Sequence, residues 1–134
     1  MGLEIYGYDG DSMKYYGLEG NDLKNILDDL GLTTTSGHYM LLQILNKPED
    51  EMMRYVDQCI KKAQRFWANR YITWPWLDPE HRTIEKFKSL TLLLNRIGER
   101  VTKAGLGFAY HNHDFEFIDH NGENGYDILM RENN

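Results

Sequence analysis

The sequence predicts an α/β protein built on a parallel β-sheet. Short stretches rich in β-branched and aromatic residues alternate along the chain with amphipathic helical stretches. Strict alternation of this kind is typical of parallel strands joined by right-handed helical crossovers. The chain has 134 residues, which is enough for one core, so we expect residues 1–134 to form a single domain.

Four strands and four helices account for most of the chain. The predicted strands are residues 3–8, 32–40, 70–76 and 107–118. The predicted helices are residues 21–31, 48–68 and 83–104, with a last helix that begins at residue 126. The Gly-rich, polar stretch 9–20 is expected to be a loop.

The helices are predicted from their ends and their apolar stripes. Asn21 or Asp22 is a candidate N-cap, Gly31 is a stop signal, and Pro48 suits a first helical turn. Apolar residues spaced three and four apart place one buried stripe on each long helix. These stripes are Met53, Val56, Ile60, Ala63 and Trp67, and then Phe87, Leu90, Leu94, Ile97 and Val101.

Composition excludes several classes of function. The net charge is −6 and no segment is rich in Lys and Arg, which argues against nucleic-acid binding. No apolar run approaches the roughly 18–20 residues of a membrane span, so no membrane partner is expected. Cys59 is the only cysteine, so no disulfide can form within the chain. A reducing compartment fits this pattern, and we expect a cytoplasmic protein.

Polar and aromatic side chains gather at the ends of three predicted strands. In parallel α/β proteins, active sites lie at the carboxyl ends of the strands. The convergence of three strand ends carries more weight than any one residue, because a lone histidine in a strand is more often structural and a lone tryptophan is more often core. The candidate site residues are His38, Trp74, Trp76, His111, Asn112, His113 and Glu116.

The two histidines of the last predicted strand share one face. Side chains alternate in a strand, so His111 and His113 point the same way and Glu116 points the other way. Two imidazoles on one face can share a divalent cation, or one can hold a metal while the other contacts substrate. A bulge or a strand end would be needed to bring Glu116 to the same side.

Several of these stretches together resemble one family. GLEIYGYDG, SGHY, YITWPW and above all AYHNHDFEF followed by GYDILM are similar to the sugar phosphate isomerase/epimerase family, whose members are xylose isomerase-like TIM barrels. The resemblance covers nearly the whole chain and implies a partial (β/α)₈ barrel. It matches LEIYG to barrel strand two and the AYHNHDFEF segment to strand five, which gives four parallel βα units, or half a barrel.

The resemblance also implies an activity. It implies a divalent-metal-dependent isomerase or epimerase that acts on a sugar or sugar derivative by proton transfer next to a carbonyl. The implied metal is Mn²⁺, with Mg²⁺, Zn²⁺ or Co²⁺ as alternatives. Glu116 is expected as metal ligand and catalytic residue, and His113 as the second catalytic residue. The residues expected to bind substrate are His38, Trp74, Trp76, His111 and Asn112.

Half a barrel raises a second expectation. A full barrel takes about 250 residues, and family ligands from strands six to eight have no counterpart in these 134 residues. We therefore expect a weakly held metal and impaired activity, and the alternative is a non-catalytic half-barrel that binds a ligand or pairs with a partner chain. The gene could be truncated, a separate chain could supply the other half, or two copies could pair. We favour a homodimer, because the sheet edges have to be covered.

Overall fold

The computed structural model describes residues 1–65, 70–74 and 76–132, with only the backbone of residues 70 and 72–74. Its main sheet has four strands in the order β1-β4-β5-β6, and every neighbouring pair is parallel. This confirms the predicted fold class. The strands are β1 (Gly2–Ile5), β4 (Thr33–Met40), β5 (Arg70–Trp74) and β6 (Gly107–Tyr110).

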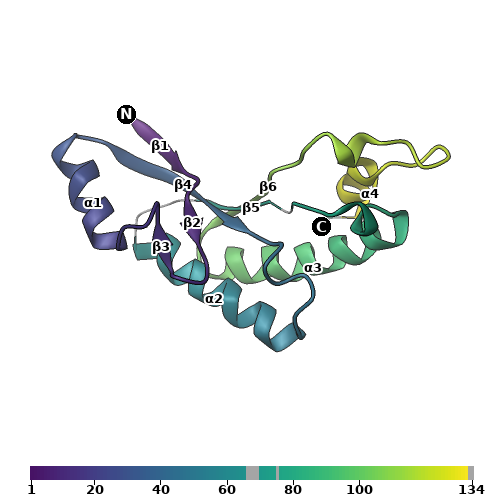
Figure 1. Ribbon diagram of the computed structural model, residues 1–134, viewed down its shortest axis with the longest axis horizontal. Coiled ribbons are helices and arrows are strands. Elements are labelled where there is room, and N and C mark those ends of the chain that lie inside the picture. The colour runs from purple at the N-terminus through teal and green to yellow at the C-terminus, as the bar shows by residue number, and fades with distance from the viewer. Residues whose placement is uncertain (66–69, 75, 133–134) are drawn as a thin grey trace.

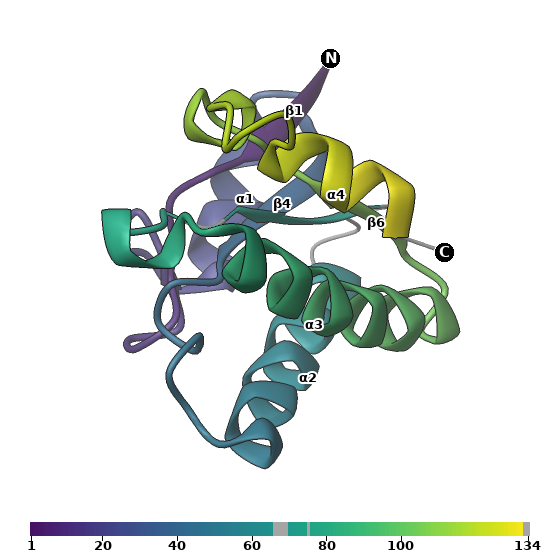
Figure 2. The same ribbon diagram turned by 90° about the vertical axis from the view of Figure 1, so that its right-hand side faces the viewer.

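Helices cover one face of this sheet. The helices are α1 (Gly20–Asp29), α2 (Glu49–Arg65), α3 (Ile84–Lys103) and α4 (Gly125–Glu132). Figure 1 shows α2 and α3 below the sheet, where α2 contacts β4 and β5 and α3 contacts β6. Figure 2 shows α4 lying beside α3. None of the helices in the described ranges is long and apolar enough to cross a membrane.

The two predicted apolar stripes form the interior. In α2, Val56, Ile60 and Ala63 are buried and Met53 is partly buried, while Trp67 lies outside the described residues. Every residue of the α3 stripe, from Phe87 to Val101, is buried. The hydroxyl of Thr83 accepts a hydrogen bond from the Lys86 backbone N–H, which caps the start of α3.

A tyrosine cluster fills the space between the sheet and α2. The ring of Tyr39 lies 5.0 Å from that of Tyr8 and 4.6 Å from that of Tyr71, and its hydroxyl is 3.2 Å from the Tyr15 hydroxyl. All four rings are buried. The fully buried Cys59 of α2 is in the same core, so this face of the sheet contributes packing.

The first predicted strand and loop need correction. The predicted strand 3–8 ends at Ile5, and the predicted loop 9–20 contains an antiparallel hairpin of β2 (Tyr8–Asp9) and β3 (Lys14–Tyr15). The Asp9 carboxylate makes the turn, because it accepts hydrogen bonds from the Asp11 N–H and the Ser12 hydroxyl. The hairpin is what brings Tyr8 and Tyr15 into the core.

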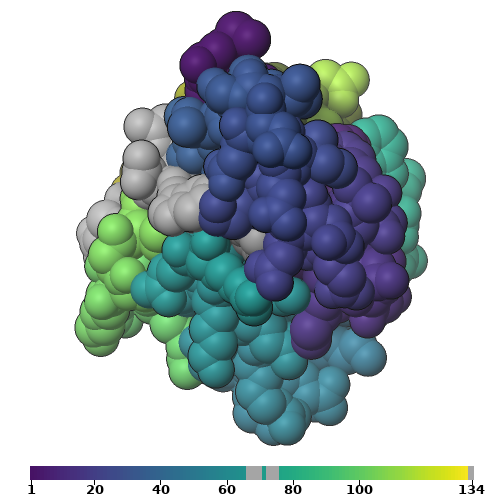
Figure 3. All heavy atoms as spheres, turned by 90° about the vertical axis from the view of Figure 1, so that its left-hand side faces the viewer, coloured from purple at the N-terminus to yellow at the C-terminus, as the bar shows by residue number. Residues whose placement is uncertain are grey.

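Helix α1 is only half embedded. Its N-cap is Glu19, without a side-chain hydrogen bond, so the predicted cap at Asn21 or Asp22 is wrong. Leu23 and Leu27 pack against the core, but Ile26 is 45% and Leu30 is 65% exposed. Gly31 follows the helix with a φ of 66°, which confirms the stop signal. Figure 3 shows this end of the molecule, with the N-terminal residues projecting beyond α1.

The last predicted strand, 107–118, is much shorter than expected. Strand β6 ends at Tyr110, and the chain then leaves the sheet through a loop and a short 3₁₀ turn, η2 (Phe115–Phe117). The aromatic alternation that predicted a long strand therefore spans three different backbone conformations. This change of path determines where the histidines point.

The buried thiol of Cys59 predicts that the free energy of unfolding falls at alkaline pH. Burial raises the pKa of Cys59 from its ordinary value of 9.0 to about 12. The folded chain keeps the thiol protonated while the unfolded chain releases the proton, so stability is lost as the pH rises from 9.0 towards about 12. We expect Cys59→Ala to lose less unfolding free energy than the wild type over this pH range, measured by urea titration. Parallel pH profiles would contradict the assignment, whatever the offset caused by the lost sulfur.

Candidate functional site

A pocket of about 500 Å³ opens at the carboxyl end of the sheet, on the face away from the tyrosine core. His38 and Tyr39 are neighbours in β4, so Tyr39 points to the helices and His38 points to the pocket. Strand ends and the loops after them supply the walls, which is where parallel α/β proteins place their sites. The pocket is lined by Tyr6, His38, Met40, Leu42, Trp76, His111 and His113.

Five rings form a continuous row along this pocket. Their centroids are separated by 6.2 Å from Tyr6 to His38, by 5.6 Å from His38 to His111 and by 5.3 Å from His111 to His113. The row ends at Trp76, which lies 5.5 Å from His113 and is 51% exposed. Each contact is edge-to-face, so the wall combines aromatic rings at its two ends with three imidazoles between them. Such a wall can bind a small molecule that has both flat apolar faces and hydroxyl groups.

Both histidines of the HNH segment (residues 111–113) line the pocket. They do so for a different reason than the predicted alternation of side chains in a strand. His111 and His113 follow the end of β6 and lie in the loop, not in an extended strand. His113 stacks on the ring of Phe115, at 5.2 Å and an interplanar angle of 10°. The guanidinium of Arg82 also lies over Phe115, 4.2 Å from the ring centroid.

His38 has a carboxylate beside it that the sequence did not predict. Its Nε2 lies 3.4 Å from Oε2 of Glu4 in β1. His38 is buried, whereas the side chain of Glu4 is 58% exposed. Glu4 can fix the orientation of the imidazole by holding one ring nitrogen.

The pocket also contains residues that the sequence did not predict, namely Tyr6, Met40 and Leu42. Tyr6 directly follows β1 and lies at the same edge of the sheet as the other strand ends. This position is a signal only with the observed strand bounds, because the predicted strand 3–8 places Tyr6 in mid-strand. Met40 and Leu42 had no comparable signal, since apolar residues at a strand end read equally well as core.

The remaining predicted site residues lie elsewhere. Asn112 is exposed, does not line the pocket, and donates a hydrogen bond to the His113 carbonyl. The side chain of Trp74 lies outside the part of the chain that the structure describes. Glu116 is fully buried behind the loop, where both of its oxygens accept hydrogen bonds from protein donors.

The described residues do not fit a complete metal site. Among them, no group of three or more His, Cys, Asp or Glu side chains is arranged to hold a metal ion. A catalytic metal normally has about three protein ligands and an open position. Glu116 has no exposed surface through which an ion could reach it. The expected divalent metal therefore stays a prediction.

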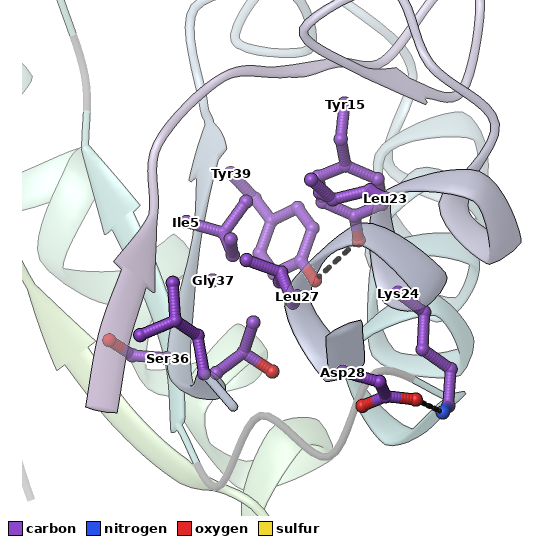
Figure 4. Close-up of a pocket in the computed structure, with 11 residues that line it drawn as sticks. Ile5, Tyr15, Leu23, Lys24, Leu27, Asp28, Ser36, Gly37 and Tyr39 are labelled. Atoms are coloured by element: carbon purple, nitrogen blue, oxygen red, sulfur yellow. Dashed lines mark hydrogen bonds and ion pairs between the residues drawn. The ribbon is translucent and has the colours of Figure 1, made fainter. Parts of the chain in front are cut away.

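A second cavity lies under α1, in the helical layer (Figure 4). It is bordered by Leu23 and Leu27 of α1 on one side and by Ile5 and Tyr39 on the other. Its volume is about 20 Å³, the space of roughly one water molecule. The ion pair between Lys24 and Asp28 lies at its edge. A space this small and apolar is a packing defect beside a half-embedded helix, so the pocket with the histidines is the candidate site.

Comparison with solved structures identifies the architecture. A sugar phosphate isomerase/epimerase from Parabacteroides distasonis superposes on 99% of this chain with a TM-score of 0.78 and 22% identity. The probable 3-DHS dehydratase AsbF of Bacillus anthracis, involved in petrobactin synthesis, superposes on 84% with a TM-score of 0.60 and 17% identity. The fold is half of a TIM barrel. This confirms the partial barrel that the sequence motifs implied.

A third solved structure adds the barrel type. A fusion of a xylose isomerase-like TIM barrel with a 4-hydroxyphenylpyruvate dioxygenase superposes on 81% of the chain, with a TM-score of 0.53 and 18% identity. The half-barrel spans 51%, 42% and 17% of the three solved chains. No protein-family model and no curated protein matches the sequence. At these identities the superpositions establish the fold, and the activity is a matter for proposal.

Proposed function

We propose that the half-barrel forms one wall of the active site of a sugar-processing enzyme, an isomerase or epimerase that moves a proton next to a carbonyl. One observation carries the proposal: the row of rings from Tyr6 to Trp76 at the carboxyl end of the sheet. Sugars have apolar C–H faces that stack on aromatic rings and hydroxyl groups that hydrogen-bond to imidazole nitrogens. Two of the solved structures with this fold are named as a sugar phosphate isomerase/epimerase and a dehydratase, which supports the same class of chemistry.

His113 is the group that we assign to proton transfer. Imidazole is the commonest general acid and base near neutral pH, and a base has to be held in a fixed orientation. His113 stacks on Phe115 and meets the edge of Trp76, so its ring is held on two sides. It would take the proton from the carbon next to the carbonyl, leaving an enediolate, and return that proton to the neighbouring carbon while the hydroxyl proton moves to the former carbonyl oxygen. His38 and His111 would hydrogen-bond to the sugar hydroxyl groups, His38 through the ring nitrogen that does not face Glu4.

The alternative is a half-barrel that binds a ligand without converting it to a product. The absence of a three-ligand metal cluster within the described residues favours this reading. The two functions differ in one observable, because binding alone does not break a C–H bond.

Solvent exchange separates these functions. We expect the chain to incorporate deuterium from D₂O next to the carbonyl of a probe ketose such as D-fructose 6-phosphate, followed by proton NMR with and without added Mn²⁺. His113→Gln should slow incorporation by at least about 100-fold, the usual contribution of a general base. His120→Gln, in the turn beyond η2, is the matched control and should exchange like the wild type. Binding of the ketose without exchange would favour the non-catalytic alternative.

We also propose that a second copy of the chain completes the barrel. Within the described residues, β1 pairs only with β4 and β6 pairs only with β5, so the sheet has two free edges. Two half-barrels about a two-fold axis would place β6 of one copy beside β1 of the other. The same arrangement brings α1 next to the partner's α4, which would cover the exposed apolar side chains Ile26, Leu30 and Met130.

The dimer has a direct test. Light scattering at micromolar concentration should give twice the chain mass of 15.8 kDa. Leu30→Arg should shift the chain to the monomer, because it places a charge in the expected contact between α1 and α4. Leu92→Arg is the matched control, since Leu92 is 61% exposed in the middle of the helical layer and away from both edges. A wild-type chain that stays monomeric, or two variants that behave alike, would contradict the proposal.

A further inference from the structure

Glu116 is a buried carboxylate whose two oxygens are both engaged. The Tyr110 hydroxyl donates a hydrogen bond to Oε1 at 2.7 Å, and the His113 backbone N–H donates to Oε2 at 2.7 Å. The side chain has no exposed surface. A buried carboxylate is costly unless such donors compensate its charge, and hydrogen bonds to a charged acceptor are the strong ones. Both carboxylate oxygens of Glu116 are therefore already used in hydrogen bonds within the protein.

These two donors lie at the two ends of the loop that carries the histidines. Tyr110 is the last residue of β6, and the His113 N–H comes just before the 3₁₀ turn η2, which contains Glu116. One carboxylate thus connects the strand end, the loop and the turn. Burial and the hydrogen bond to Glu116 raise the pKa of Tyr110 far above its ordinary value of 10.0, so its hydroxyl remains a donor.

The fixed loop orients the His113 ring. Its amide is held by Glu116, its imidazole is stacked on Phe115, and the imidazole Nδ1 is 4.0 Å from Glu116 Oε1. That last separation is too long for a hydrogen bond, so the hydrogen bond that Glu116 makes with His113 is to its backbone N–H, while the carboxylate lies within ion-pair range of the ring nitrogen. If the chain continued as a strand beyond Tyr110, this geometry would be lost.

We propose that Glu116 is a positioning residue for the pocket: it sets the path of the loop from His111 to Asp114 so that the His113 imidazole faces the substrate, and it neither binds a metal nor carries a proton. The proposal rests on the proposed function for the role of His113, but the loop geometry it describes is independent of any activity. It also reassigns a residue that the sequence favoured as a metal ligand.

The Glu116→Gln variant distinguishes a positioning role of Glu116 from a role as a base or as a metal ligand. The amide oxygen of Glu116→Gln can accept from the His113 N–H, and its NH₂ group can donate to the Tyr110 oxygen once that hydroxyl rotates. Both contacts persist in Glu116→Gln, whereas an amide can neither act as a base nor serve as an anionic ligand. In Glu116→Leu, a change to an apolar side chain, both contacts are lost. Glu123→Gln makes the same chemical change in the next turn, outside the loop, and serves as the control.

The readout is the NMR signal of the His113 ring protons. Stacking on Phe115 gives these protons a ring-current shift, which reports the loop geometry in the full chain without any ligand. We expect the shift to persist in Glu116→Gln and Glu123→Gln and to be lost in Glu116→Leu. Deuterium exchange of the probe ketose should stay within about tenfold of wild type in Glu116→Gln, the effect of weakening a charged hydrogen bond to a neutral one.

Two results would overturn the proposal. A Glu116→Gln chain that keeps the ring-current shift but loses all exchange would show that the carboxylate has a chemical role. A Glu116→Leu chain that keeps the shift would show that Glu116 does not hold the loop. If Glu116→Leu does not fold, Tyr110→Phe takes its place, because it removes one donor and should displace the His113 signal, and an unchanged signal again contradicts the role. If the wild type shows no exchange, the proposed function fails while the shift still tests the positioning.

Discussion

Parallel pairing of the four strands is the constraint on which the rest of this structure depends. A parallel neighbour can be reached only by a crossover, so each strand is followed by a segment that returns along the sheet. The carboxyl ends of β1, β4, β5 and β6 consequently meet at one edge. Residues that are far apart in the chain, such as Tyr6 and His111, line one pocket for this reason.

One face of the sheet packs in the core and the other face lines the pocket. Alternation along β4 sends Tyr39 into the tyrosine core and His38 into the pocket. The core face is closed by α2 and α3, which leaves the pocket face to be completed by whatever else the barrel contains. One face of the sheet is therefore packed in the core, while the pocket lies on the opposite face.

The loop after β6 departs from the long strand that its sequence pattern predicts. Residues 107–117 have the alternation of a long strand, yet pairing stops at Tyr110. The turn brings the Glu116 carboxylate to the Tyr110 hydroxyl and the His113 N–H, two hydrogen bonds that an extended chain would not form. Local β-propensity depends on context, and here the strand pattern does not extend the pairing beyond Tyr110.

The sequence by itself determined the alternation of strands and helices, the parallel sheet, the buried stripes of α2 and α3, and the gathering of histidines and tryptophan at the strand ends, because periodicity and strand-end position are local properties. Only the tertiary structure decided the hairpin that places Tyr8 and Tyr15 in the core, the exposure of Ile26 and Leu30, and the end of β6 at Tyr110. It also decided that Glu116 lies behind the pocket wall and that Glu4 lies beside His38. These features depend on contacts between residues that the chain brings together only when it folds, and spacing along a sequence does not encode which partner a buried group will find.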